Sequence, residues 1–357
     1  MVFLMAGGGT GGHVIPGIAV ARELAARGHE PIFIGTRNGL EAKLVPSAGY
    51  ALEFVEIGSF KGQGVVKRLQ TILQLPASVL QCLRLLRRYQ AAGVFSMGGY
   101  VAGPVTLAAA LQRVSLILME PNAMPGLTNR RMARFARKAL LSFEEAASYF
   151  PAGNVELTGL PVRDEFFDIP FKAPGEIITV LITGGSRGAR TLNEAAKGLW
   201  PLIRGANLPL RILLQTGADH YDAMARVFTA ARVDGRVMPF VDDMPRAFAE
   251  ADLIVCRSGA GAVAELAAAG KPSILVPYPY AADDHQAKNA AAMEHAGAAR
   301  TLRDSDCTPT RLLSEIRAML EPVVLSEMSV AARSLARRGA ARRAADLLEE
   351  YAGIRKQ

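Results

Sequence analysis

The sequence predicts an α/β protein of two domains, each with a parallel sheet and helical crossovers. Three observations support this fold class. The chain has 357 residues, enough for two domains; short apolar runs alternate with helical stretches; and the alternation restarts near the middle. Hydrophobic residues make up 50% and charged residues 21% of the chain, which excludes a disordered protein.

The first half opens with an apolar strand, a glycine turn and a helix. Residues 2–5 are apolar, glycines crowd residues 7–12, and residues 16–27 carry a helical pattern that ends before Gly28. Further apolar runs predict strands at 31–35, 93–96, 115–119 and 139–142.

Residues 65–88 alternate apolar and basic side chains around Pro76. This pattern predicts either two buried helices broken by the proline or a segment that dips into an anionic membrane surface.

A second half repeats the first after a stretch rich in proline and glycine. Residues 163–176 lack helical or strand periodicity and predict a linker. The strand at 177–183, the glycine turn at 184–188 and the helix at 189–199 then repeat the opening pattern. Apolar runs predict further strands at 211–216, 236–240, 251–256 and 272–276. We therefore expect one domain at 1–162, a second at 177–330, and a C-terminal helix at 331–357.

That last stretch is rich in alanine and arginine. A solvated cationic helix face is the expected explanation of its arginines at 333, 337, 338, 342 and 343.

The overall charge and the cysteines narrow the class of protein. A formal net charge of +8 is too mild to indicate nucleic acid, and we expect no such partner; it fits an anionic small molecule or a membrane surface. The three scattered cysteines predict reduced thiols in a cytosolic protein. Without a signal peptide or a spanning run of about 18 apolar residues, any membrane contact is expected to be peripheral.

Two glycine turns have the context of phosphate sites. Residues 7–12 contain GxGxxG between a strand and a helix, where free backbone N–H groups bind anions. NAD enzymes need an acid after the next strand, and that acid is missing here, although Arg37 could suit NADP. A glycine turn needed only for tight packing is the alternative to a phosphate site. Ser186 lies in the matching turn at 184–188, and a third glycine cluster occupies 98–103. One such turn in each half predicts a ligand cleft between the domains.

Three polar features are candidates for catalysis or recognition. His13 follows the first turn, where an imidazole suits a general base, unless it only caps or packs. Glu265 falls early in a helix, where its carboxylate could accept hydrogen bonds from both hydroxyls of a ribose. The alternative is an acid favoured there only by the helix dipole. The cluster from Asp283 to Gln286 suggests sugar recognition, with a solvated loop as the alternative. Histidine and acidic spacings give no metal site.

Several motifs in fixed order resemble the MurG family. That family moves N-acetylglucosamine (GlcNAc) from UDP-GlcNAc to undecaprenyl-pyrophosphoryl-MurNAc-pentapeptide in peptidoglycan synthesis. The motifs that carry the resemblance are Gly8-Gly9-Thr10-Gly11-Gly12-His13-Val14-Ile15-Pro16-Gly17, Met97-Gly98-Gly99-Tyr100, Pro125-Gly126-Leu127-Thr128-Asn129, Gly184-Gly185-Ser186-Arg187-Gly188-Ala189-Arg190, Cys256-Arg257-Ser258-Gly259-Ala260 and His285-Gln286 with Asn289-Ala290.

The resemblance implies a GT-B fold, with two Rossmann-like domains facing across a cleft and the C-terminal helix returning to the first. It implies an inverting transfer to the MurNAc 4-hydroxyl, from lipid I to lipid II, without a metal or other cofactor. His13 would be the base. The substrate-binding residues would be Thr10, Gly11, Gly12, Asn122, Arg163, Ser186, Val241, Ala260, Gly261, Ala262, Val263, Ala264, Glu265 and Gln286.

Within that set, Ser186 would meet the diphosphate, Val241 the uracil through its backbone, Glu265 the ribose and Gln286 the sugar hydroxyls. The implied partners are UDP-GlcNAc, lipid I, an anionic membrane surface that residues 65–88 touch, and further cell-wall synthesis proteins. The implied location is peripheral, on the cytoplasmic face of the inner membrane.

Two other functions fit part of the pattern. A UDP-GlcNAc 2-epimerase would share the fold and the nucleotide but needs no lipid acceptor. A non-enzymatic membrane-bound scaffold would explain residues 65–88 but neither the two phosphate turns nor the ribose acid.

Overall fold

The computed structural model describes residues 1–9, 11–57 and 65–353, with side chains described outside 65–73. It divides into two compact units. The first unit comprises residues 1–162 and 337–357, and the second comprises residues 163–336.

The first unit is built on a parallel sheet. Its described strands lie in the order β3-β2-β1-β4-β5-β6-β7. The central strands are buried along almost their whole length, which explains their continuous apolar sequence. The strands are β1 (Val2–Gly7), β2 (Glu30–Gly35), β3 (Ala51–Phe54), β4 (Gly93–Gly98), β5 (Ser115–Glu120), β6 (Lys138–Leu141) and β7 (Val155–Leu157).

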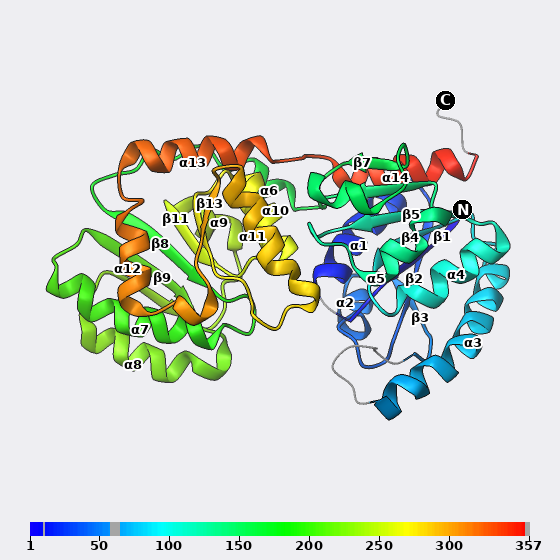
Figure 1. The fold of residues 1–357 in the computed structure, drawn as a ribbon, viewed down its shortest axis with the longest axis horizontal. Coiled ribbons are helices and arrows are strands. Elements are labelled where there is room, and N and C mark those ends of the chain that lie inside the picture. Colours follow the sequence, from blue (N-terminus) through cyan, green and yellow to red (C-terminus); the bar gives the residue numbers. More distant parts are fainter. Residues whose placement is uncertain (10, 58–64, 354–357) are drawn as a thin grey trace. The chain divides into compact units, whose positions relative to one another are not determined.

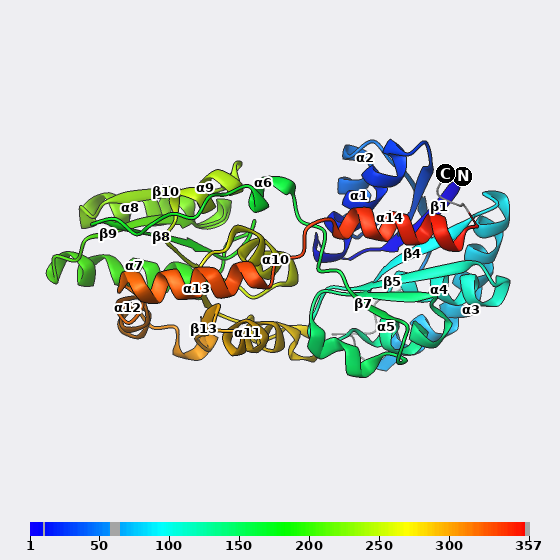
Figure 2. The same cartoon turned by 90° about the horizontal axis from the view of Figure 1, so that it is seen from above.

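Helices cover both faces of this sheet. Figure 2 shows α1, α2 and α14 on one face and α3, α4 and α5 on the other. These helices span α1 (Gly11–Ala26), α2 (Glu41–Ser47), α3 (Val65–Arg88), α4 (Ala102–Gln112), α5 (Leu127–Met132) and α14 (Ala340–Tyr351).

The second unit repeats this plan. Its described strands are all parallel and lie in the order β10-β9-β8-β11-β12-β13. Counted from its own first strand, this is the order 3-2-1-4-5-6 of Rossmann-like sheets, and the first unit shows the same order before its seventh strand. The predicted α/β class with two parallel sheets is confirmed (Figure 1).

The second unit's strands are β8 (Ile178–Thr183), β9 (Leu210–Gln215), β10 (Gly235–Met238), β11 (Leu253–Cys256), β12 (Ser273–Leu275) and β13 (Ala299–Thr301). Its helices are α6 (Asp164–Phe167), α7 (Arg190–Gly205), α8 (Tyr221–Ala231), α9 (Met244–Glu250), α10 (Ala260–Ala269), α11 (His285–His295), α12 (Pro309–Arg317) and α13 (Pro322–Ser334).

Two helices differ from the sequence prediction at a proline. α1 begins at Gly11 rather than at residue 16, so Pro16 lies inside it and not at its start. α3 runs without a break through Pro76, so the prediction of two helices is wrong. A proline costs a helix one backbone hydrogen bond, but Val79, Cys82 and Leu86 are buried against the core and hold α3 in place.

The stretch 163–176, expected to be a linker, contains α6 and packs into the second unit. Phe166 is fully buried and meets Phe248 edge to face at 5.0 Å between ring centroids. The guanidinium of Arg333, on α13, also ties the stretch down, because it donates to the carbonyls of Phe167, Ile169, Ala268 and Ala269.

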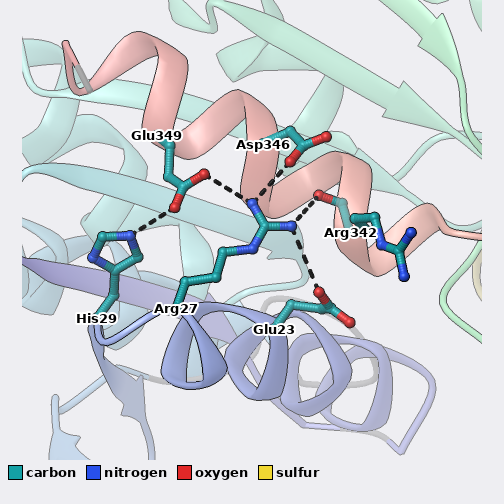
Figure 3. A network of polar contacts seen from close by, with 6 residues as sticks. All are labelled: Glu23, Arg27, His29, Arg342, Asp346 and Glu349. Carbon is teal, nitrogen blue, oxygen red and sulfur yellow. Dashed lines mark hydrogen bonds and ion pairs between the residues drawn. The ribbon is translucent and has the colours of Figure 1, made fainter. Parts of the chain in front are cut away.

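α14 is fastened to α1 within the first unit by a cluster of charged groups (Figure 3). Arg27, just past the end of α1, donates at 2.8 Å to both Asp346 and Glu349. Glu349 also pairs at 2.8 Å with Nε2 of His29. The last helix of the chain is therefore an integral layer of the first unit.

Candidate functional site

The predicted motifs gather at the point in each sheet where the strand order reverses. In the first unit this is the carboxyl end of β1 and β4, and in the second it is the carboxyl end of β8 and β11. Ligands of open α/β sheets bind at such points, because the loops that leave the two strands diverge there.

The first glycine turn joins β1 to α1. Gly9 has a φ of +87°, which favours glycine, and its N–H donates to Glu41 at 2.8 Å. Gly11 and Gly12 form the first turn of α1, whereas Thr10 lies outside the described residues.

His13 follows in the same turn of α1 and is half-buried. It packs beside the turn after β4, where a Cβ added to Gly99 would lie 3.5 Å from its Nδ1. Gly98 and Gly99 have φ values of +80° and +83°, so this close approach depends on glycine. The structure thus brings His13 together with the glycine cluster at 98–103.

A buried acid that the sequence prediction missed organises the neighbouring loop. Glu120 ends β5 and is 2% exposed. It accepts hydrogen bonds from the backbone N–H groups of Asn122 and Gly126, and from the side-chain amide of Asn129 at 2.9 Å. Burial raises the pKa of Glu120 to about 7, against the opposing effect of these hydrogen bonds. Asn122 is held through its own backbone next to this carboxyl.

In the second unit, the turn at 184–188 presses against the turn that follows β9. Gly188 has a φ of +72°, and a Cβ there would overlap the carbonyl of Thr216. Gly217, in the facing turn, has a φ of +79°, and a Cβ there would overlap the carbonyl of Arg187. Between these tight contacts Ser186 stays exposed, so its hydroxyl is accessible to a ligand.

Gln215 connects that turn to the loop that holds Val241. Its amide Nε2 donates to the carbonyl of Gly185 at 2.7 Å, and its Oε1 accepts from the N–H of Val241 at 2.9 Å. Gln215 is 1% exposed, at the end of β9. Because the N–H of Val241 already donates to Gln215, its carbonyl is the backbone group that could accept a hydrogen bond from a nucleotide base.

α10 begins just after β11 with small residues. Ala260, Gly261 and Ala262 leave the helix start open, and Val263 and Ala264 continue toward Glu265. Burial raises the pKa of Glu265 to about 7, while the charge of Arg163 acts to lower it. Arg163 and Glu265, both in the second unit, therefore interact electrostatically.

Gln286 lies in the first turn of α11, near the start of α10. Its Oε1 accepts from the N–H of Tyr278 at 2.9 Å, and its carbonyl accepts from the buried hydroxyl of Ser258 at 2.8 Å. Asp283 and Asp284 precede it with φ values of +54° and +55°, a strained pair for residues other than glycine. The Gln286 amide nitrogen is the end of the side chain that could donate to a sugar hydroxyl.

Within the described ranges, no three His, Cys, Asp or Glu side chains are grouped so that they could hold a metal ion. The same residues include no helix with the length and hydropathy of a membrane span. The cleft expected between the two domains stays a prediction.

Comparison with known proteins identifies the family. The N-terminal domain of glycosyltransferase family 28 matches residues 3–141, and the C-terminal domain of that family matches residues 179–348. A relative in Solibacter usitatus, named UDP-N-acetylglucosamine--N-acetylmuramyl-(pentapeptide) pyrophosphoryl-undecaprenol N-acetylglucosamine transferase, is 54% identical over 98% of this chain and 96% of its own.

Solved structures agree with this match. The crystal structure of Acinetobacter baumannii MurG is 31% identical, with a TM-score of 0.83 over 98% of this chain and 99% of that chain. A UDP-GlcNAc 2-epimerase from Neisseria meningitidis, 12% identical with a TM-score of 0.65 over 98% of this chain and 99% of its own, shares the fold alone. The chain belongs to the MurG family of glycosyltransferases, as its motifs predicted.

Proposed function

We propose that this protein transfers GlcNAc from UDP-GlcNAc to the MurNAc 4-hydroxyl of undecaprenyl-pyrophosphoryl-MurNAc-pentapeptide, converting lipid I to lipid II in peptidoglycan synthesis. The observation that carries the proposal is the 54% identity, over nearly the whole chain, to a relative named for this transfer. The two glycine turns at the two strand-order reversals support it, because each suits an anionic ligand.

The second unit would bind the donor. The turn around Ser186 and the open start of α10 offer backbone N–H groups to the diphosphate. The carbonyl of Val241 would accept N3–H of uracil, Glu265 would accept ribose hydroxyls, and Gln286 would donate to the sugar. Arg163, whose charge acts on Glu265, would add positive charge near the nucleotide.

The first unit would bind the acceptor and supply the base. His13 would take the proton of the attacking hydroxyl, a step that a positioned base accelerates by about 100- to 10,000-fold. Gly11 and Gly12 would lie against the donor's sugar and diphosphate, as would Thr10, which is outside the described residues, and Asn122 would reach the donor. Attack from the side opposite the leaving UDP inverts the anomeric carbon through an oxocarbenium-like transition state.

The leaving diphosphate gains negative charge as the bond to the sugar breaks. Preorganised N–H groups and the positive end of α10 would stabilise that charge. We therefore propose a transfer that needs neither a divalent ion nor another cofactor.

We also propose peripheral binding to an anionic membrane on the cytoplasmic face of the inner membrane. α3 supports this because its two sides differ. Val79 and Leu86 face the core, whereas Leu80 is 54% exposed and Arg84 and Arg87 are exposed as well. Further cell-wall synthesis proteins are candidate partners at that surface, and nucleic acid is not.

The test is an assay of the purified protein with labelled UDP-GlcNAc, a short-chain lipid I analogue and a chelator. We expect label in a lipid product with an inverted glycosidic bond. Labelled ManNAc derivatives formed without acceptor would indicate a 2-epimerase instead. Absence of both products, with UDP still bound, would indicate a non-enzymatic protein.

A further inference from the structure

The proposed function assigns no role to Glu41, an acid that binds the glycine turn after β1. Glu41 is the first residue of α2, and its side chain is completely buried. Burying a carboxylate is costly unless hydrogen bonds replace its water shell.

Both oxygens of Glu41 act as acceptors. Oε2 accepts the N–H of Gly9 at 2.8 Å, and Oε1 accepts the N–H and the hydroxyl of Thr36 at 2.9 Å and 2.8 Å. An ionised carboxylate matches three donors, whereas an amide in its place would turn an NH₂ toward at least one of them.

Three glycines make room for this carboxylate. A Cβ on Gly8 would lie 2.5 Å from its Oε1, and a Cβ on Gly35 would lie 2.5 Å from its Cγ. A Cβ on Gly39 would overlap the carboxylate itself. These glycines come from the turn after β1, the end of β2 and the loop before α2, so three separate segments leave space for one side chain.

The glycine turn that Glu41 holds is shared with His13. A Cβ on Gly99 would lie 3.3 Å from the carbonyl of Gly8 and 3.5 Å from Nδ1 of His13. The Gly8 backbone and the His13 ring therefore pack on the same glycine, and a shift of the turn would displace both.

We infer that Glu41 is a positioning residue for the transfer reaction, acting through the Gly8–Gly9 turn on His13. This inference rests on the proposed function.

The test compares Glu41→Gln with the wild type in three measurements: kcat, the donor KM, and the affinity for UDP by calorimetry. The value of kcat is expressed per UDP-binding site, so unfolded molecules are not counted. We expect kcat to fall about 100-fold, the loss that a 1 Å displacement of a catalytic group can cause. The donor KM and the UDP affinity should stay within about twofold, because the donor nucleotide binds the second unit.

Glu156→Gln is the matched control. It also removes a carboxylate of the first unit, one that accepts from Arg343 at 2.9 Å, but it does not touch a glycine turn. It should lower the melting temperature and leave kcat per UDP-binding site unchanged. Gly39→Ala should reproduce the effect of Glu41→Gln, because its methyl group displaces the carboxylate although no residue of the turn itself is substituted. It also serves as the test if Glu41→Gln yields no folded protein.

A kcat within threefold of the wild type in both variants would overturn the inference. An equal loss of UDP affinity and kcat would overturn it too, because an effect that acts through His13 leaves the affinity for UDP unchanged. A wild-type protein that binds UDP but transfers nothing to the lipid I analogue would instead refute the proposed function.

Discussion

The side chain of Gln215 accepts the N–H of Val241 at 2.9 Å and, from its other end, donates to the carbonyl of Gly185 at 2.7 Å. One buried side-chain amide thus sets the spacing between the turn proposed to bind the diphosphate and the loop proposed to bind uracil. Neither residue is close to Gln215 in sequence, so the link exists only in the folded sheet.

Gln215→Leu should weaken UDP binding and reduce the preference for uracil. The change leaves two backbone groups unpaired at a cost of about 1–3 kcal/mol each, so we expect the UDP affinity to fall at least about tenfold. Cytosine lacks the N3–H that the Val241 carbonyl would accept. Displacement of that carbonyl should therefore reduce the difference in affinity between UDP and CDP. Calorimetric titration with both nucleotides measures this.

Leu312→Ala is the control for Gln215→Leu. It creates a cavity in the core of the second unit, away from the binding edge, and should lower stability without changing the ratio of UDP to CDP affinity. An unchanged ratio in Gln215→Leu would contradict the assigned role.

Donor binding should depend on pH through Glu265. Burial raises the pKa of this carboxyl to about 7, so below that pH it is largely protonated in the free protein and is a poorer acceptor for ribose hydroxyls. We expect UDP affinity to fall as the pH is lowered from 8 to 6. Glu265→Gln should bind UDP more weakly at pH 8 and lose most of this dependence.

Arg163→Met tests the cause of that dependence. The charge of Arg163 lowers the pKa of Glu265, so its removal should raise that pKa and shift the loss of affinity to higher pH. If the pH dependence of UDP affinity stays where it is in the wild type, Arg163 does not lower the pKa of Glu265.

Stability should depend on pH through Glu120. Its pKa is about 7 in the folded protein against an ordinary value of 4.5, so the folded state binds a proton more tightly than the unfolded state. Glu120 therefore contributes on the order of 3 kcal/mol to the unfolding free energy below pH 4.5, and this contribution is lost as the pH rises through 7.

The test for Glu120 is urea unfolding between pH 5 and pH 8. The wild type should lose stability over this range. Glu120→Gln keeps the neutral shape of the side chain and should show a shallower decline. An equal decline in both proteins would assign the effect to other groups.

The sequence predicted the fold well because buried parallel strands leave a strong local pattern. It missed β3, β7 and β13, which are short, lie away from the sheet centres, and in β3 and β7 are only partly buried. It also misplaced the start of α1 and divided α3, because the rule that a proline ends a helix is local and packing against the core is not.

The sequence pointed to the glycine turns that lie at the strand-order reversals, but not to the single buried side chains that hold those turns and the loops near them. Glu41, Glu120 and Gln215 carry no motif, and their partners lie in other loops. The C-terminal arginines show the same limit. Arg333 donates to four backbone carbonyls, so the prediction of a solvated cation is wrong for this residue. Arg343 pairs with Glu156, although its side chain stays 41% exposed.

Glu349→Gln should loosen α14 from the first unit. Burial acts to raise the pKa of Glu349, but hydrogen bonds from His29 and Arg27 outweigh it and hold the pKa below its ordinary value (Figure 3). We expect a loss of about 1–3 kcal/mol in unfolding free energy at pH 7 and faster proteolysis near residue 337. The difference from the wild type should shrink as the pH falls below the ordinary carboxyl value and through the lowered pKa of Glu349, where the wild-type carboxyl becomes protonated.

Glu350→Gln is the control for this helix. It lies next to Glu349 but is exposed, so it should change stability by no more than about 0.5 kcal/mol. UDP binding should be unchanged in both variants. Equal stability of the two would show that the charged cluster does not fasten α14.

His13→Ala should lower turnover more than donor affinity. If His13 takes the proton of the acceptor hydroxyl, kcat should fall about 100- to 10,000-fold, while UDP, bound by the second unit, keeps its affinity. His295→Ala, at the end of α11, is the control and should retain full activity. Wild-type turnover in His13→Ala would exclude His13 as the base, and the half-buried ring beside Gly99 would then serve only to pack the two turns together.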